Sequence, residues 1–502
     1  MYTKNKTFVK LSDGLCQPFD SSVGLLQGET SSPLLFNLFV NKISKVFDQS
    51  CDPVAINNTD QSCLLWSDDL CVFSQSEQGL QNAIDKVVLF YSSLGLQLSS
   101  KKTKVLIFNK SGKVLKGHSF LINGAQLEVT DSYQYLGIKL RPSGSFTTAT
   151  EVLSDKARKA WFSLSKIVYK DKKISVDRAF NLFDSLVSPV ALYGCEMWYP
   201  HILPKKCVQD KSKLLSFWED FKCEKINQLC ARVLLSVHRK ASRLAVLGEL
   251  GRYPMSVRAM SHTLNYRLCL ASKPENSLIG HTMTEMKKMS KSNQDCWLAR
   301  TDKMAKLLSV PDIRYGQSSG RQLLKYVQGK FDMFWLSEIK SSKLDKDGVE
   351  HNKLLTYSSF KAQFSMEPYL ALVQNRNQRC QLSRLRVSAH RLGIELLRYC
   401  RPPVPRNRRF CKYCPPEKGP TGQIVGPVDD ECHFVTSCTV GQTDRADVYK
   451  EVASGKSTFM ELCSVDKFKT LVCPITPFDC KIVNRFLENQ FKRRDNIDIG
   501  IL

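Results

Sequence analysis

The sequence lacks any long uninterrupted hydrophobic run. The longest candidate, residues 182–199, is broken by Asp184 and Glu196, whereas a bilayer-spanning helix needs ~20 apolar residues. The first twenty residues are polar and charged, without the apolar core of a secretory signal. These absences argue against a membrane protein and against an exported one. We therefore expect no membrane partner and a setting in the nucleus or cytoplasm.

Acidic residues are few relative to basic ones. The 502 residues include 48 Asp and Glu against 73 Lys and Arg, which gives a net charge of +25 and a pI of about 9.3. Such a surplus favours a polyanionic partner, most commonly nucleic acid, although it also serves simple solubility. The 19 cysteines, without a visible export signal, predict reduced thiols or metal ligands rather than disulfides.

A β-hairpin is predicted where two short apolar runs, residues 64–66 and 70–73, flank Ser67, Asp68 and Asp69. Adjacent carboxylates repel each other unless a cation neutralises them. Mg²⁺ prefers such oxygen ligands and keeps positions open for substrate phosphates. An Asp-Asp pair is also typical of a solvated turn. The surrounding sequence therefore has to decide between a metal site and an ordinary turn.

Helical periodicity follows the hairpin. Ser74-x-x-Glu77 fits a capping box, apolar residues recur at helical spacing as far as Leu94, and Gly95 fits a helix stop. Residues 105–108 then predict a buried strand. The later part of the chain is helical in pattern. Its first helix has an apolar stripe formed by Ala157, Ala160, Trp161, Leu164 and Ile167.

Four segments, in a fixed order, resemble motifs of the reverse transcriptases. Residues 24–39 resemble the segment that lines the nucleotide and template site, and residues 65–70 resemble the aromatic-x-Asp-Asp metal motif. Residues 95–104 resemble the next motif, and residues 135–138 resemble the loop that grips the primer end. The helical region and the C-terminal cysteines make the chain similar to non-LTR (LINE-like) retrotransposon polymerases.

The resemblance implies roles for individual residues of the first two motifs. Asp68 would be a ligand of Mg²⁺ or Mn²⁺, with Asp69 beside it. Gln27 and Gly28 would lie near the nucleotide and template strand, where a glycine allows close backbone approach. RNA and DNA, as template and primer, and deoxynucleoside triphosphates are the partners that these roles imply.

The later two motifs carry roles that compete with structural explanations. Lys102 would be a proton donor or phosphate contact, or else a solvated loop lysine. Tyr135 and Gly137 would help to hold the primer terminus, or else form a core aromatic and a tight turn.

One expected acid is missing from the motif series. The first metal-binding aspartate of the family precedes its Gln-Gly segment by several tens of residues, whereas Gln27 lies near the start of this sequence. Asp13 and Asp20 are the only acids before it, and both fall in a predicted loop and hairpin. A two-metal site needs carboxylates on both sides of the metals. We therefore expect a truncated polymerase fragment that is inactive alone, and the sequence leaves its status as an enzyme open.

A second metal site is predicted near the C-terminus. Cys411, Cys414, His433 and Cys438 fit a closed Cys₃His zinc site, which is structural rather than catalytic. The glycine- and proline-containing insertion is tolerated because loop length costs little. The pattern resembles the Cys-Cys-His-Cys knuckle of LINE-type polymerases, although the insertion is longer here. Cys432 is an alternative ligand to His433, and ordinary reduced thiols are the alternative to Zn²⁺.

Basic and aromatic residues surround the cysteines and suit single-stranded RNA or DNA. The basic residues are Arg401, Arg406, Arg408, Arg409 and Lys412. The aromatic residues are Phe410, Tyr413 and Phe434, each of which could instead pack around the metal.

The sequence as a whole predicts an α+β protein with a partial reverse-transcriptase palm of antiparallel strands and helices, a helical thumb and linker region, and a zinc knuckle. The boundaries are 1–140 for the palm, 141–250 for the thumb-like region, 251–400 for the helical linker, 401–445 for the knuckle and 446–502 for a tail. The alternative function is that of a catalytically silent nucleic-acid-binding protein that uses the thumb and knuckle. A remnant without a stable role is the third possibility.

Overall fold

The computed structural model describes residues 6–20, 24–25, 28–115, 117–341, 353–418 and 424–500. The chain divides into two compact units, Met1–Ser145 with Lys273–Gln294, and Phe146–Ser272 with Asp295–Leu502. Short strands mixed with helices agree with the predicted α+β class. The first unit includes Lys273–Gln294, which the sequence alone had placed in the helical linker. The finer domain boundaries remain predictions.

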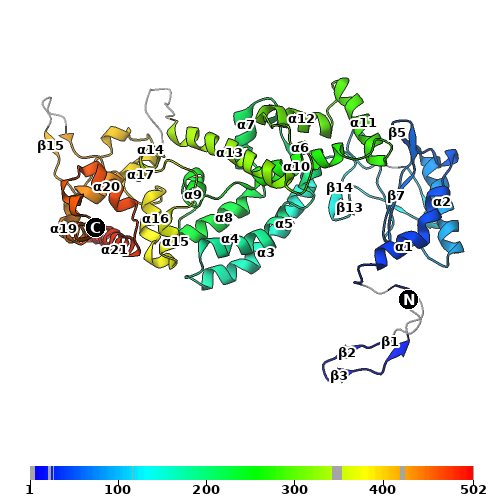
Figure 1. Ribbon diagram of the computed structural model, residues 1–502, viewed down its shortest axis with the longest axis horizontal. Coiled ribbons are helices and arrows are strands. Elements are labelled where there is room, and N and C mark those ends of the chain that lie inside the picture. The colour runs from blue at the N-terminus through cyan, green and yellow to red at the C-terminus, as the bar shows by residue number, and fades with distance from the viewer. Residues whose placement is uncertain are drawn as a thin grey trace. The chain divides into compact units, whose positions relative to one another are not determined.

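The first unit combines short two-stranded sheets with three helices among its described residues (Figure 1). The strands are β1 (Lys6–Thr7), β2 (Lys10–Leu11), β3 (Gly14–Leu15), β4 (Phe19–Asp20), β5 (Val54–Ile56), β6 (Thr59–Gln61), β7 (Cys63–Trp66), β8 (Asp69–Val72), β9 (Lys104–Val105), β10 (Leu121–Ile122), β11 (Ala125–Gln126), β12 (Glu128–Val129), β13 (Tyr133–Tyr135) and β14 (Ile138–Leu140). The helices are α1 (Ser32–Val40), α2 (Glu77–Ser93) and α11 (Leu278–Lys291), with 3-10 helices η1 (Asn41–Lys45) and η2 (Gln49–Cys51). The strands pair antiparallel except for β9 with β12, which are parallel.

Helix α2 forms where the sequence predicted it, but its N-cap is Ser76 and not Ser74. The Ser76 hydroxyl accepts a hydrogen bond from a backbone amide one turn on, at 3.1 Å. Glu77, predicted to close a capping box, is instead hydrogen-bonded to His118 at 2.7 Å. The helix ends just before Gly95, which takes a φ of 73° and so acts as the predicted stop.

The apolar face of α2 joins the small sheets into a core. Val87 and Tyr91 pack with Val40 and Ile43, from the end of α1 and from η1. Ile84 belongs to a second cluster, whose other buried members are Val105, Phe120, Ile122 and Leu127. These contacts fix α1, α2 and the β7–β8 hairpin as one body.

The strand predicted at residues 105–108 is shorter than expected. β9 ends at Val105, because its parallel partner β12 has only two residues. Beyond that point the Asn109 side chain donates to the Ile107 carbonyl at 3.1 Å, which occupies an acceptor that a longer sheet would need.

The second unit is helical apart from one small hairpin among its described residues (Figure 1). Its helices are α3 (Thr147–Lys170), α4 (Val176–Leu186), α5 (Ser188–Ala191), α6 (Cys195–Ile202), α7 (Lys211–Ser216), α8 (Glu224–Leu235), α9 (Arg243–Glu249), α10 (Met255–Ala271), α12 (Trp297–Leu308), α13 (Ser319–Lys340), α14 (Leu355–Phe360), α15 (Pro368–Leu372), α16 (Cys380–Arg386), α17 (Gly393–Leu396), α18 (Glu431–Thr436), α19 (Gln442–Gly455), α20 (Ser464–Val472) and α21 (Pro477–Gly500). The remaining elements are η3 (Lys205–Val208), η4 (Phe217–Glu219), η5 (Arg376–Gln378), η6 (Leu397–Tyr399), η7 (Arg406–Arg408), η8 (Thr439–Gly441), η9 (Ser457–Glu461), β15 (Glu417–Lys418) and β16 (Ile424–Val425). Within the described ranges, no helix has both the length and the apolar character to cross a membrane.

The apolar stripe of α3 differs from the predicted one at its end. Ile167 is 57% exposed, and the adjacent Val168 is buried in its place. Trp161 is also buried and packs edge-on against Phe183 of α4, with ring centroids 5.9 Å apart. The 3.6-residue period over a long helix carries the buried face to Val168 rather than to Ile167.

Buried ion pairs tie distant helices of this unit together. Asp184 of α4 accepts two hydrogen bonds from Arg252, at 2.7 and 2.8 Å, and also contacts Arg258. Burial alone would raise the pKa of Asp184, but the bonds from Arg252 and Arg258 lower it to about 2. Arg386 and Glu249 form a fully buried pair elsewhere in the unit.

Candidate functional site

The β7–β8 hairpin forms as the sequence predicted. Trp66 lies opposite Asp69 in an antiparallel register, so that Ser67 and Asp68 make the turn. Ser67 takes a φ of 53°, in the left-handed region. Asp68 and Asp69 are both exposed. Two carboxylates therefore face solvent at the tip of a short and well-defined hairpin.

Asn37 of helix α1 holds the turn of this hairpin in place. Its side-chain oxygen accepts a hydrogen bond from the Ser67 backbone amide at 3.1 Å. A side chain thirty residues away thus satisfies a turn amide that would otherwise depend on water. The sequence analysis did not single out Asn37. It lies within the motif at residues 24–39, so its polarity in an otherwise apolar helix was the available signal.

The segment predicted to grip the primer is a second hairpin, β13–β14. Tyr135 pairs with Ile138, and the turn has Leu136 and Gly137 at positive φ, 45° and 84°. Burial first, then the nearby Cys71 and Asp69, raise the pKa of Tyr135.

Of the other predicted site residues, Gly28 and Lys102 have no described hydrogen bond or ion pair to Asp68 or Asp69. Gln27 lies outside the described residues. Gly28 has a φ of 86°, and an added Cβ there would meet nothing within 4 Å, so its backbone is open to approach. Lys102 is exposed in a turn, where its amide donates to the Ser99 carbonyl at 3.1 Å. In the described part of the chain, no contact links the Lys102 side chain to Asp68.

No third candidate metal ligand lies beside the two aspartates in the described part of the chain. Among the described residues, no His, Cys, Asp or Glu completes a ligand group with Asp68 and Asp69. Asp13 lies in the turn between β2 and β3, and Asp20 lies in β4 opposite Lys6. The hairpin as described therefore brings two carboxylates together without a third candidate ligand.

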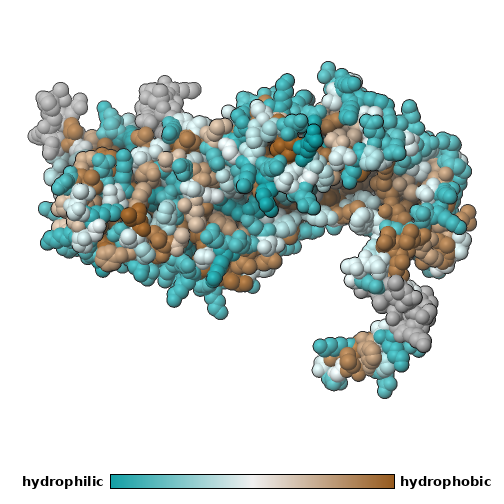
Figure 2. All heavy atoms as spheres, viewed as in Figure 1, coloured by the Kyte–Doolittle hydropathy of each residue, from teal (hydrophilic) through white to brown (hydrophobic). Residues whose placement is uncertain are grey.

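Large apolar side chains are exposed around the hairpin. Trp66 is 65% exposed, and Leu34, Leu38 and Phe39 of α1 are 63%, 63% and 57% exposed. Figure 2 shows apolar atoms gathered over α1. Exposed apolar surface next to a functional hairpin is typical of an interaction face.

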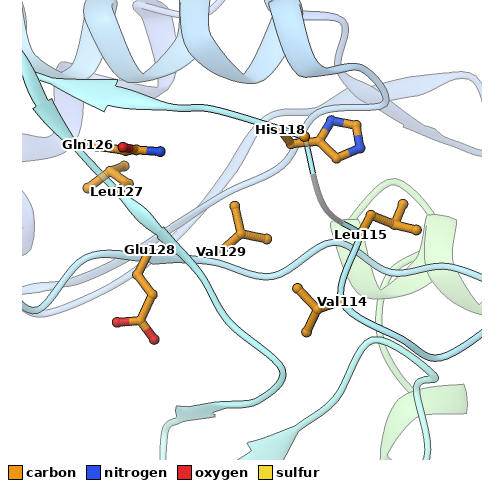
Figure 3. A pocket seen from close by; sticks show the side chains of 8 residues that line it. Val114, Leu115, His118, Gln126, Leu127, Glu128 and Val129 are labelled. Carbon is orange, nitrogen blue, oxygen red and sulfur yellow. The ribbon is translucent and has the colours of Figure 1, made fainter.

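A shallow pocket lies elsewhere in the first unit, around β11 and β12 (Figure 3). It is lined by Val114, Leu115, Gly117, His118, Gln126, Leu127, Glu128 and Val129. Its charged side chains already have partners, since Glu128 pairs with Lys104 at 2.5 Å and His118 with Glu77 at 2.7 Å. We assign the pocket no role.

In the second unit, Cys411, Cys414, His433 and Cys438 come together as predicted. All four are buried, and their ligand atoms lie within 4.8 Å of one another. Cys414 Sγ is 3.3 Å from His433 Nε2, whose ring is oriented by Ser437 at Nδ1, 3.0 Å away. The fold thus brings His433, and not Cys432, together with the three cysteines. Three sulfurs and one imidazole nitrogen suit Zn²⁺.

Arg494 of helix α21 completes the surroundings of this cluster. Its guanidinium donates to Cys438 Sγ at 3.0 Å and to Cys411 Sγ at 3.5 Å, and it pairs with Asp429 at 2.8 Å. It also lies over the Tyr413 ring, 4.6 Å from the centroid. A cation among thiols offsets the negative charge that three thiolates would bring to a metal. Sequence reasoning missed Arg494 because it lies more than fifty residues after Cys438, the last cysteine of the cluster.

The pKa values of the two thiols that contact Arg494 are shifted in opposite directions. A bond from the Cys411 thiol, aided by His433 and Arg494, lowers the pKa of Cys438 to about 3. The same bond, together with burial, raises the pKa of Cys411. The shared bond therefore favours the thiolate form at Cys438, and the thiolate is the form of cysteine that binds metals.

Arg409, predicted to contact nucleic acid, has a structural role instead, and Phe434 follows the packing alternative that the sequence left open for the aromatic residues. Arg409 is 1% exposed, and its guanidinium donates to the Val404 and Ile394 carbonyls at 2.8 Å each. Phe434 is buried and stacks on Phe491, with centroids 4.5 Å apart. The exposed basic residues near the cluster are Arg401, Arg408 and Lys412.

Comparison with known proteins bears on the first unit. Residues 2–140 match the family model described as reverse transcriptase (RNA-dependent DNA polymerase). A Pol polyprotein from the type-2 retrotransposable element R2DM of Drosophila melanogaster is 29% identical over 135 residues, 26% of this chain and 13% of that protein. This segment is thus similar to reverse transcriptases and to Pol proteins of R2 retrotransposable elements. The resemblance stated from its four motifs is confirmed.

Two further relatives extend the comparison. The Pol polyprotein from a type-1 retrotransposable element R2 of Bradysia coprophila is 25% identical over 140 residues, 26% of this chain and 16% of that protein. A protein of the type-1 element R1DM of Drosophila melanogaster is 22% identical over 245 residues, which is 49% of this chain and 22% of that protein. The chain thus spans under a quarter of the length of each of these three relatives.

Proposed function

We propose that the chain is part of an RNA-directed DNA polymerase of a non-LTR retrotransposon, in which Asp68 and Asp69 bind Mg²⁺ or Mn²⁺. The observation that carries the proposal is the hairpin itself, with two carboxylates at a turn held by Asn37. Deoxynucleoside triphosphates and an RNA template with a DNA primer are the substrates that fit this arrangement.

The chemistry of this site is a nucleotidyl transfer. Divalent ions would neutralise the adjacent carboxylates and bind the triphosphate oxygens, while the primer hydroxyl attacks the α-phosphorus and pyrophosphate leaves. The exposed tip leaves room for phosphates, and the rigid turn fixes the carboxylate positions. Because the described residues provide carboxylates from one side only, we propose that the polypeptide does not extend a primer unless another segment supplies a third acid.

Metal-directed cleavage tests whether the aspartates bind a divalent ion. Fe²⁺ substituted for Mg²⁺, with ascorbate and peroxide, should cut the chain close to residues 66–70. Asp68→Ala should abolish these cuts, while Asp60→Ala, on the neighbouring β5–β6 hairpin, should leave them unchanged. Equal cleavage in the wild type and Asp68→Ala would refute metal binding at the hairpin.

A second function is supported by the Cys/His cluster. We propose that it binds Zn²⁺ and, through Arg401, Arg408 and Lys412, contacts the phosphates of single-stranded RNA or DNA. Such a protein could act in nucleic-acid binding alone. Its setting would be the nucleus or cytoplasm, where thiols stay reduced.

Salt dependence separates this binding function from weak general attraction. The affinity for a single-stranded oligonucleotide should fall steeply with salt, and the slope should become smaller by about one for each phosphate contact removed. Arg408→Ala should show this change, whereas Arg409→Ala should lower stability instead. An unchanged slope for Arg401→Ala, Arg408→Ala and Lys412→Ala together would exclude the proposed surface.

A further inference from the structure

A second group of metal-ligating side chains lies in the helical unit, away from the Cys/His cluster of the C-terminal region. It consists of Cys195 and Glu196, which begin helix α6, and His262 on helix α10. One ligand atom from each residue lies within 4.8 Å of the other two. The polymerase proposal uses none of these residues.

The spacing of the three atoms is wider than ordinary hydrogen bonding. His262 Nδ1 lies 3.6 Å from Glu196 Oε1 and 3.9 Å from Cys195 Sγ. A direct N–H···O bond is about 2.9 Å long. In a tetrahedral zinc site with bonds of about 2.1 Å to N or O and 2.3 Å to S, neighbouring ligand atoms are about 3.4–3.6 Å apart. The observed separations of 3.6 and 3.9 Å are close to these ligand-to-ligand distances.

A single nitrogen, His262 Nδ1, faces both the sulfur and the carboxylate. The separations of 3.6 and 3.9 Å are long for direct hydrogen bonds, whereas a cation placed between the three atoms could bind all of them. The three atom types also match a borderline metal rather than Mg²⁺ or Ca²⁺, which prefer oxygen alone.

The surrounding fold holds the ligands while leaving access. Helices α6 and α10 pack directly against each other. The Trp297 indole donates to the Glu196 carbonyl at 2.9 Å, which fixes the backbone directly after the two adjacent ligands. Cys195 is fully buried, but the His262 and Glu196 side chains are 51% and 33% exposed. An ion could therefore enter from solvent and reach the buried sulfur.

We propose that Cys195, Glu196 and His262 form a second Zn²⁺ site, with water as the fourth ligand. Binding exchanges the thiol proton of Cys195 for the metal, and that proton passes to solvent. Three protein ligands with one open position distinguish this site from the closed Cys₃His cluster. The site joins α6 to α10 independently of any polymerase activity.

Zinc counting on the full chain tests the proposal. After removal of loosely bound metal by gel filtration, mass spectrometry of the metal content should give two zinc ions per chain. His262→Gln should reduce the number to one, and so should Cys414→Ser through the other site. His238→Gln, an exposed histidine in the same unit, should leave it at two. Chelator competition should show that Glu196→Gln weakens the less tightly bound ion about 10- to 100-fold.

Two variants keep the test informative if a substitution disturbs folding. His262→Gln and Glu196→Gln change partly exposed side chains, so circular dichroism should match that of the wild type. Co²⁺ bound to the wild type should show a thiolate-to-cobalt band that decreases in His262→Gln. One zinc ion per wild-type chain, or two zinc ions retained by folded His262→Gln, would overturn the proposal.

Discussion

Single side chains outside the ligand set determine how well the Cys/His cluster can hold a metal. Arg494 donates to two of its sulfurs, whereas the adjacent Arg493 is turned to the surface and pairs with Asp444. Arg494→Ala should therefore weaken Zn²⁺ binding about 10- to 100-fold, by removing the positive charge beside the thiolates. Chelator competition measures this, with Arg493→Ala as the matched control. Equal affinities in the two variants would contradict the role given to Arg494.

Asn37 offers a second comparison between neighbouring side chains. Loss of its bond to the Ser67 amide should cost about 1 kcal/mol locally, so that amide exchange in residues 63–72 becomes about fivefold faster in Asn37→Ala. Hydrogen exchange followed by mass spectrometry measures the change. Asn41→Ala, at the exposed position directly after the same helix, should leave exchange in the hairpin unaltered. Faster exchange in both variants would mean that the helix, and not the bond, is responsible.

The sequence could predict residues whose chemistry is local to a motif. Asp68 and Asp69 are adjacent in the sequence, and Cys411 and Cys414 have the spacing of metal ligands. Arg494 and Asn37 act across long stretches of chain, and nothing in the sequence near them shows their partners. The prediction for Arg409 was wrong for a different reason. Its charge suggested a role at the surface, whereas its guanidinium donates to the carbonyls of Val404 and Ile394.

The sequence predicted the type of each element more accurately than the residues at which it begins and ends. Helix α2 follows the expected periodicity, but Ser76 caps it rather than Ser74, because Glu77 is engaged by His118. Strand β9 is shorter than predicted, since its partner strand sets its length. Periodicity reports which face is buried, whereas caps and strand ends depend on contacts that the sequence does not reveal.

The connection of α4 to the Arg252 segment should depend on pH. The pKa of Asp184 is lowered to about 2 from an ordinary value near 3.8, so its contribution to stability is present above pH ~4 and is lost as the pH falls towards 2. Asp184→Asn should cost at least ~2 kcal/mol near neutral pH and flatten the pH dependence of unfolding between 5 and 2. Urea unfolding across this range measures it, with the exposed Asp177→Asn as control. An unchanged acid slope in Asp184→Asn would show that other carboxylates dominate.

The chain as a whole combines a segment at residues 2–140 that matches reverse transcriptases with a helical unit that contains a Cys/His cluster. The sequence motifs anticipated both ends of this arrangement. They could not anticipate that Lys273–Gln294 packs with the first unit, because Asn57 contacts His281 at 3.2 Å and Lys288 at 2.8 Å across more than two hundred residues. Contacts of that range depend on the fold and leave no periodic signal.

The central claim is that residues 1–502 carry one side of a two-metal polymerase site. Primer extension on an RNA template with Mg²⁺ or Mn²⁺ tests it most directly, with the purified chain beside Asp68→Ala. The account predicts that neither protein extends the primer, because the described residues offer no third acid to Asp68 and Asp69. Extension by the wild type that disappears in Asp68→Ala would contradict it, and would show that this chain completes the metal site by itself.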